Sequence, residues 1–419
     1  MKKKMGPIEK SEMVHAYGML VPTVLIVLLI VLFPLFASFW ISFKDVSISD
    51  LRKAEIKVTE KFSKKPKTID DISIIEYKFN NFSKSTSILN VSFTDNFPEG
   101  IKALDWPKSC EVDHKEIKCF LGDFKPKDKK KLKIQVVAQD IYFNKTEKPK
   151  DSKPIVLGKS KSKLYNLNLN FKNFTNIFSS PDFWPIIKVS FLYSFFSASG
   201  SLFLGILAAL LLTSTFPGRG IIRGIFLFPY IAPIIAVTIT WVILLDPFFG
   251  TVNAILKELN IINVPIHFFG IRDIDILFLG LEFKFPVALT FVILFESWRY
   301  FPLAMLFILA RLQSVPTELF EAADIDGATP IQKFKFITWP LILSIIFILF
   351  LLRFIWTFNK FDDIFLLTGG SSGTKTLTVN VYETGFNIGN LGAGAANAVL
   401  VFLILIISAL IIIKLSPKE

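Results

Sequence analysis

Six long apolar segments alternate with polar segments along the chain. They cover residues 16–43, 184–213, 222–245, 285–312, 341–358 and 391–413. Each is long enough to cross the hydrocarbon core of a bilayer, which takes about 20 helical residues. The pattern therefore predicts a mainly α-helical membrane protein with six transmembrane helices. The first segment lacks a small-residue cleavage site, so we expect it to be retained as an anchor.

A polar block separates the first two apolar segments. Short stretches within it are rich in Ile, Val and Phe and are separated by turn signals such as FPEG. These stretches are residues 87–93, 100–106, 116–122 and 130–139. In the last one, Leu132, Ile134 and Val136 alternate with Lys and Gln, which is the period of a half-buried strand. The sequence predicts a small β-sandwich inserted between helices 1 and 2.

The alternation predicts three parts of the chain. Residues 1–44 form a cytoplasmic N-terminus and the first transmembrane helix. Residues 45–180 form an extracytoplasmic β-rich insertion, whose sequence resembles the immunoglobulin-like repeat of bacterial and archaeal surface proteins. Residues 181–419 form the core domain, with transmembrane helices 2–6 and a polar cytoplasmic loop at 313–340.

Composition and charge support this topology. The chain is 52% hydrophobic, has a mean hydropathy of +0.52 and carries a net charge of +12. Basic residues gather on one side of the predicted membrane, which places both termini in the cytoplasm. They are Lys2, Lys3, Lys4, Lys10, Arg219, Arg223, Lys333, Lys335, Lys414 and Lys418. The other lysines lie largely in the polar block, where we interpret them as solvated surface, so no nucleic-acid partner is expected.

Both cysteines of the chain, Cys110 and Cys119, lie in the polar block. Outside the cytosol they could form a disulfide, which in the chain-entropy model would contribute about 2–3 kcal/mol for so short a loop. The alternative is two reduced, partly buried thiols. Together with His114 they fall short of the four ligands of a structural zinc site, so no metal is expected.

The polar loop reads ELFEAADIDGATPIQKFKFITWP from residue 318 to 340. Pro316 suits the first position of a helix, and Glu318 and Glu321 then lie near its positive end. Asp326 and Gly327 end that helix. Thr329, Pro330 and Gln332 form the pattern of a capping box that starts a second short helix, and Pro340 then marks the return to the membrane. The loop therefore predicts a cytoplasmic helix–turn–helix.

This loop resembles the EAA loop of ABC importer permeases, which docks on the ATP-hydrolysing subunit. The resemblance implies that the loop couples the chain to an ATPase, whereas the alternative is an interfacial hairpin without a partner. The residues implied in coupling are Glu318, Glu321, Ala322, Ala323, Asp326, Gly327 and Ala328. The stretches FLFPYIAPIIAVTITW, ESWRYFPLAMLFILARL, FNKFDDIFLLTGG and LGAGAANAVLVFLIL resemble the carbohydrate-uptake, maltose-type branch of the same family.

The resemblance implies a permease subunit of a binding-protein-dependent ABC importer for a sugar, oligosaccharide or related polyol, phosphorylated glycerol included. Its expected partners are a second homologous permease, two ATPase subunits, an extracytoplasmic solute-binding protein and membrane lipid. The chain has no Gly-x-x-x-x-Gly-Lys phosphate loop, so ATP and Mg are expected on the ATPase subunits and no cofactor or enzyme activity on this chain. The rivals are a secondary transporter, and a membrane-anchored surface-binding protein that uses the β-rich block alone.

The maltose-type resemblance also implies a solute path through the membrane helices. Its residues here are Tyr230, Ile234, Glu296, Arg299, Tyr300, Arg353, Thr357 and Lys360. Four of them are charged, and a charge at mid-membrane costs at least about 2.5–3.5 kcal/mol unless it is paired or hydrated. We therefore expect a polar cavity, with Glu296 paired to Arg299 or Arg353. The alternative is that these charges lie near the ends of the spans and pair or snorkel there.

Overall fold

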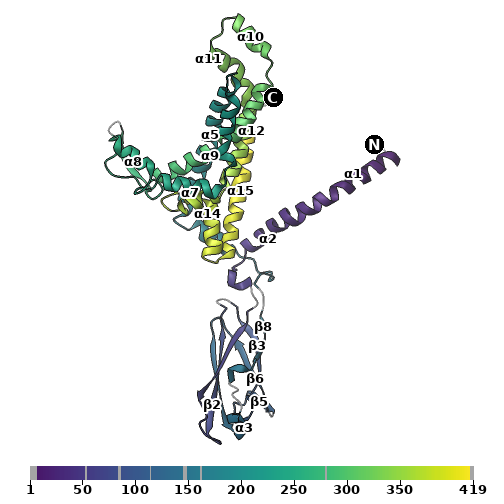
Figure 1. The fold of residues 1–419 in the computed structure, drawn as a ribbon. Helices are drawn as coiled ribbons and strands as arrows, with labels where there is room; N and C mark the ends of the chain where they lie inside the picture. Colours follow the sequence, from purple (N-terminus) through teal and green to yellow (C-terminus); the bar gives the residue numbers. More distant parts are fainter. Residues whose placement is uncertain are drawn as a thin grey trace. The chain divides into compact units, whose positions relative to one another are not determined.

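The chain folds into two compact units, drawn as a ribbon in Figure 1. The computed structural model describes residues 7–51, 54–83, 86–113, 115–144, 149–160, 163–278 and 281–415. The helical unit comprises Met1–Ser42, Phe174–Asn387 and Ala393–Glu419. The β-rich unit comprises Phe43–Asn173 together with Ile388–Gly392, so the short turn before the last helix belongs to it.

The helical unit contains most of the apolar sequence. Its first helical stretch runs through α1 (Pro7–Ile26), the π-helical η1 (Val27–Leu32) and α2 (Phe33–Ser42). The following helices are α4 (Lys172–Phe178), α5 (Phe183–Thr213), α6 (Arg219–Ile231), α7 (Ile234–Leu244), α8 (Thr251–Glu258) and α9 (Val287–Gln313). The remaining ones are α10 (Thr317–Ile325), α11 (Pro330–Lys333), η4 (Phe334–Thr338), α12 (Trp339–Phe358), α13 (Asp362–Thr368), α14 (Leu377–Tyr382), η5 (Glu383–Asn387) and α15 (Leu391–Leu415). A hairpin of β9 (Ile274–Phe278) and β10 (Leu281–Phe285) precedes α9.

Within the described residues, five helices are long and apolar enough to cross a membrane. They are His15–Ser42, Phe183–Thr213, Val287–Gln313, Pro330–Phe358 and Leu391–Leu415. They confirm five of the six predicted spans. The fifth predicted span begins earlier than expected, because the helix is continuous from Pro330.

The third predicted span, residues 222–245, is not one straight helix. It consists of α6 and α7, which meet at an angle of 93°. Ala232 between them is extended and Pro233 precedes the first residue of α7. Proline has no N–H to donate and its ring disfavours helical geometry in the residue before it, so Ala232 cannot continue α6 into α7. The sequence predicted one transmembrane helix here; the structure has a bent pair, which makes a sixth span if the two helices cross the membrane together.

Close contact between α5 and α9 forms the centre of the helical unit. A Cβ atom added to Gly205 would lie 2.6 Å from the Cβ of Ala304, and one added to Gly200 would lie 2.4 Å from the Oγ of Ser297. Glycine therefore lets the two helices approach backbone to backbone, as small residues do in membrane bundles. This packing fixes the position of α9, and with it the side chains of Glu296, Arg299 and Tyr300 on that helix.

The β-rich unit is a sandwich of two four-stranded sheets. One sheet has the order β1-β2-β7-β4 and the other β5-β6-β3-β8. The strands are β1 (Ile56–Lys64), β2 (Ile72–Asn81), β3 (Ile88–Asn96), β4 (Ile101–Asp105), β5 (Cys110–Asp113), β6 (Glu116–Phe124), β7 (Lys129–Ala138) and β8 (Ile155–Ser160). The short η2 (Ile48–Leu51), α3 (Asp140–Asn144) and η3 (Pro149–Asp151) flank them. All neighbouring strands within the sheets are antiparallel.

Apolar residues from both sheets share one core. Ile75 and Ile134 from the first sheet are fully buried with Val91 and Ile117 from the second. The predicted alternation in residues 130–139 is present in β7, where Leu132, Ile134 and Val136 face inwards. Four strands, β1, β2, β5 and β8, lie outside the stretches that the sequence pattern singled out.

Cys110 and Cys119 face each other across β5 and β6 and are joined by a disulfide. Direct cross-strand pairing brings the two sulfur atoms together, because opposed side chains share one face of the sheet. His114, which the sequence hypothesis weighed with them, lies outside the described residues.

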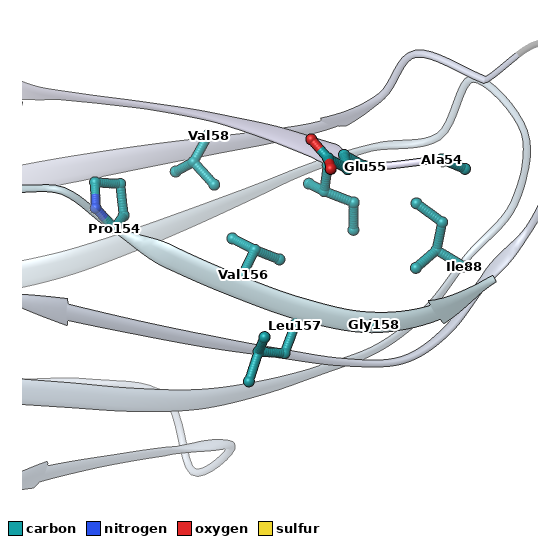
Figure 2. Close-up of a pocket in the computed structure, with 9 residues that line it drawn as sticks. Ala54, Glu55, Val58, Ile88, Pro154, Val156, Leu157 and Gly158 are labelled. Carbon is teal, nitrogen blue, oxygen red and sulfur yellow. The ribbon is translucent and has the colours of Figure 1, made fainter. Parts of the chain in front are cut away.

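A cleft opens at one edge of the sandwich, between the edge strands β1 and β8 (Figure 2). It has a volume of about 440 Å³. Val58 and Val156 point toward each other across it, and both pack against the core. The cleft is thus the open edge of the sandwich core.

Two neighbouring acidic side chains, the half-buried Glu60 and the buried Asp95, make the stability of the sandwich sensitive to pH. Ser152 donates a hydrogen bond of 2.7 Å to Glu60, and Tyr77 donates one of 2.9 Å to Asp95. Burial, followed by the neighbouring Asp95 carboxyl, raises the pKa of Glu60 from 4.5 to about 8. Between these two values the unfolded chain has lost the Glu60 proton and the folded chain retains it, so a rise in pH favours unfolding.

We expect hydrogen-exchange protection of the β1 and β2 amides in the full-length protein, corrected for intrinsic exchange, to fall between pH 5 and pH 8. Glu60→Gln should flatten this dependence, because the amide does not titrate. Glu111→Gln, at an exposed position of β5, is the matched control and should leave the dependence intact. Equal pH slopes in the wild type and Glu60→Gln would contradict the assignment.

Candidate functional site

The loop after α9 forms a helix–turn–helix. Gly327 follows α10 with a φ of +73°, a left-handed conformation that glycine adopts without strain. The amide of Ala328 donates to the carbonyl of Ala323 at 2.9 Å, which closes the end of α10. The predicted capping box is present: the amide of Thr329 donates to Gln332 Oε1 at 2.7 Å, and the Gln332 amide donates to Thr329 Oγ1 at 3.4 Å.

The start of this loop and the length of its second helix differ from the prediction. Pro316 is the N-cap of α10, one position before the first helical residue. The second helix is not a short separate one, because α11, η4 and α12 run on continuously from Pro330 through Pro340 to Phe358. The π-helical turn η4, in which the Trp339 amide bonds to the Phe334 carbonyl, directly precedes Pro340. A widened turn there accommodates the proline ring without a kinked break.

The residues implied in coupling lie together at the surface of this helix–turn–helix. Glu318, Glu321, Ala322, Asp326 and Gly327 are exposed, while Ala323 and Ala328 are half-buried. Two large apolar side chains flank the turn: Ile325 is 88% exposed and Ile331 is 78% exposed. Lys333 forms an ion pair with Asp324 that ties the two helices together. In Figure 1, α10 and α11 form one end of the helical unit.

A second group of predicted residues meets between α9 and α12. Arg353 Nη2 donates to Glu296 Oε1 at 2.8 Å, and Lys360 Nζ lies 3.2 Å from Glu296 Oε2. Thr357 donates to the same carboxylate at 3.3 Å. Lys360 also lies 2.5 Å from Asp363 Oδ2. Two carboxylates and two cations therefore share one network, and Glu296, Arg353 and Asp363 are almost completely buried.

The ring of Tyr300 forms one wall of this network. The guanidinium of Arg353 lies 4.1 Å from the ring centroid and the ammonium of Lys360 lies 3.6 Å from it. Both are cation–π distances, which are worth more in a desolvated site than at the surface. Tyr230 makes an edge contact with Tyr300 at 5.8 Å, so the tyrosine of α6 joins the same neighbourhood.

Two predicted residues stand outside the network. Arg299 donates to the carbonyl of Ala232 at 3.2 Å, at the bend between α6 and α7. Of the two partners expected for Glu296, Arg353 is the one that the structure shows, and Arg299 is not. Arg299 and Ala232 lie on neighbouring elements, whereas Glu296 faces α12. Ile234, the first residue of α7, is half-buried.

Asp363 belongs to the network although the sequence interpretation did not include it. It lies on α13, three residues after Lys360. The run FNKFDDIF offered a signal, because Lys360 and Asp363 carry opposite charges and are only three residues apart. The sequence could not show that Asp363 lies close to Glu296 on α9, because that proximity depends on how the helices pack.

A cavity of about 490 Å³ opens beside the network. Its walls carry two cations, a carboxylate, an amide and three aromatic rings, and its lining consists of Tyr300, Arg353, Trp356, Asn359, Lys360, Phe361 and Asp362. Such a mixture of hydrogen-bonding groups and apolar rings suits non-covalent binding of a polar ligand. Among the described residues, no group of three or more His, Cys, Asp or Glu side chains could hold a metal ion.

Comparison with known families identifies the chain. Residues 201–418 match the family described as the binding-protein-dependent transport system inner membrane component. The chain belongs to this family. It is a multi-pass membrane permease of an ABC-type transport system and not an enzyme. The matched region contains the helix–turn–helix, the charge network and the cavity beside it.

Two relatives of known name are also transport system permeases. The chain is 31% identical over 248 residues to the trehalose/maltose transport system permease protein MalF of Thermococcus litoralis, covering 59% of this chain and 79% of the relative. It is 30% identical to the sn-glycerol-3-phosphate transport system permease protein UgpA of Agrobacterium fabrum, covering 58% and 79%.

A solved bacterial ABC transporter for the acidic polysaccharide alginate contains a chain with a similar fold. The TM-score is 0.53 at 21% identity, covering 60% of this chain and 85% of that one. At this identity the likeness concerns the fold alone.

Proposed function

We propose that this chain is the permease subunit of an ABC importer for a sugar, an oligosaccharide or a related polyol, phosphorylated glycerol included. The cavity beside Tyr300 supports this solute class, because its aromatic rings can cover the apolar face of a sugar while Asn359, Arg353 and Lys360 bond to hydroxyl or anionic groups. The two named relatives transport a disaccharide and a glycerol phosphate, which fits the same range.

The observation that carries the proposal is the exposed helix–turn–helix after α9. It presents Glu321, Ala322 and Ile325 to solvent on a turn held by Gly327 and the capping box. A rigid, partly apolar projection of this kind fits a docking groove on an ATPase subunit. We propose two such subunits, which carry ATP and Mg, and a second homologous permease that completes the path.

The proposed topology follows from the position of this loop. With the helix–turn–helix in the cytoplasm, both termini are cytoplasmic and the β-rich unit, residues 45–180 in the sequence prediction, lies outside the cell as an insertion between transmembrane helices 1 and 2. An extracytoplasmic solute-binding protein then delivers the solute from the side on which the β-rich unit lies.

Uptake by the purified complex in proteoliposomes tests this function. With the solute-binding protein and ATP supplied on their respective sides, we expect saturable uptake of a labelled disaccharide or of glycerol 3-phosphate. Omitting either ATP or the binding protein should abolish uptake, because other subunits hydrolyse ATP and deliver the solute. Uptake driven by a sodium or proton gradient without ATP would contradict the proposal and favour a secondary transporter.

A further inference from the structure

The outer face of the β1-β2-β7-β4 sheet carries an unusual concentration of positive charge. Side chains alternate between the two faces of a strand, so every second residue points outwards. Within the described residues, the strand register places two acidic residues on this face, Glu76 and Asp105, and seven lysines besides Lys64, which is paired with Asp71. The lysines, which we call the lysine face, are Lys57 and Lys61 on β1, Lys78 on β2, Lys102 on β4, and Lys129, Lys131 and Lys133 on β7.

The opposite sheet shows that this charge is confined to one side. Its outer face mixes acidic and basic side chains: Glu111, Asp113 and Glu116 with Lys118 and Lys159. The lysines of the block, interpreted from sequence as solvated surface, are indeed largely exposed. Their segregation to one sheet is not required for solubility, which a mixed distribution would provide equally well.

The lysine face also works against folding. Lys78 and Lys131 are direct cross-strand partners, and like charges in that position destabilise a sheet. Glu76 lies between Lys61 and Lys133 in the register and is 3.7 Å from Lys78, so one carboxylate serves several ammonium groups. The fold does not need this array of lysines, and the lysines repel one another. An anionic partner would offset that repulsion.

Part of this face is hollowed into a site of about 320 Å³. Its lining includes Lys57, Lys78, Lys129 and Lys131, the neutral hydrogen-bonding side chains of Thr59 and Asn80, and Phe82. Phe82, just after β2, is 63% exposed. The hollow thus combines several cations and hydrogen-bonding groups with an exposed aromatic ring, within the size range of ligand sites.

We propose that the lysine face binds an acidic carbohydrate chain that bears carboxylate, phosphate or sulfate groups. Phe82 provides a flat apolar surface for one face of a sugar ring, Thr59 and Asn80 bond to hydroxyl groups, and the lysines bind the anionic groups. An acidic protein surface is a poorer match, because lysine is depleted from the cores of protein interfaces. This inference concerns the β-rich unit and does not rest on the proposed transport function.

Binding of a fluorescent oligogalacturonate to the full-length protein in nanodiscs of uncharged lipid tests this proposal. We expect saturable binding that weakens as salt is added, since salt screens exposed charges. Lys78→Gln combined with Lys131→Gln should weaken it about tenfold or more, because a hydrogen bond to a charged group is worth that much. Phe82→Ala should weaken it as well, by removing the ring surface.

The matched control removes the same charge from the opposite sheet. Lys118→Gln combined with Lys159→Gln should leave the affinity unchanged, and neutral maltohexaose should not compete. If polyglutamate of similar charge binds as tightly as the uronate and Phe82→Ala has no effect, the face is an acidic-protein surface and the proposal is overturned. Absence of uronate binding would overturn it too.

Discussion

Gly327→Val is expected to lower the solute-stimulated ATP hydrolysis of the assembled transporter about tenfold or more while leaving membrane insertion unchanged. Gly327 has a φ of +73°, and a β-branched residue is a strong outlier there. Strain of about 1–3 kcal/mol would reshape the turn between α10 and α11 and remove most of the docking-competent population. ATPase activity of the reconstituted complex, with and without loaded binding protein, measures the effect.

Gly218→Val provides a closely matched control. Gly218 has a φ of +83° before α6, and in both glycines an added Cβ would meet no atom within 4 Å. The control therefore introduces the same backbone strain outside the helix–turn–helix, and its stimulated ATPase activity should stay close to that of the wild type. Normal stimulation in Gly327→Val, or equal losses in both variants, would refute the coupling assignment.

The second large effect is expected at the buried charge network. Arg353→Met leaves Glu296 and Asp363 with Lys360 as their remaining cation in the network, and breaking a buried pair in this way costs about 3–5 kcal/mol. Combining it with Glu296→Leu removes both charges and leaves Lys360 paired with Asp363. We expect the double variant to recover most of the thermal stability that the single variant loses, as followed by intrinsic fluorescence in detergent.

Transport by the stable double variant then decides what the charge pair does. Arg353 lines the cavity, so we expect solute uptake to fall about tenfold or more even though assembly is restored. Unchanged uptake would mean that the pair is structural and that the charges merely satisfy each other within the helical unit. The half-exposed pair Lys375 and Glu383 is the control: replacing both should change stability by less than about 1 kcal/mol and leave uptake intact.

The sequence alone determined those features that depend on neighbours close along the chain. Apolar length predicted five of the candidate spans, and alternation predicted the strand that contains Leu132 and Ile134. The turn at Gly327 and the capping box of Thr329 and Gln332 were also predicted, because these interactions join residues within one helical turn. The resemblance of the same residues to a permease loop agrees with the family to which the chain belongs.

The tertiary structure decided which distant residues meet. Glu296 pairs with Arg353, 57 positions away, and not with its near neighbour Arg299. The reason is that the packing of α9 against α12 brings Glu296 and Arg353 together. Asp363 joins the network for the same reason. The pattern of apolar residues also ran without interruption across Ala232 and Pro233, where the backbone turns by 93°. Finally, the strand order gathered the dispersed lysines on one sheet face, since cross-strand register, not sequence distance, determines which side chains become neighbours.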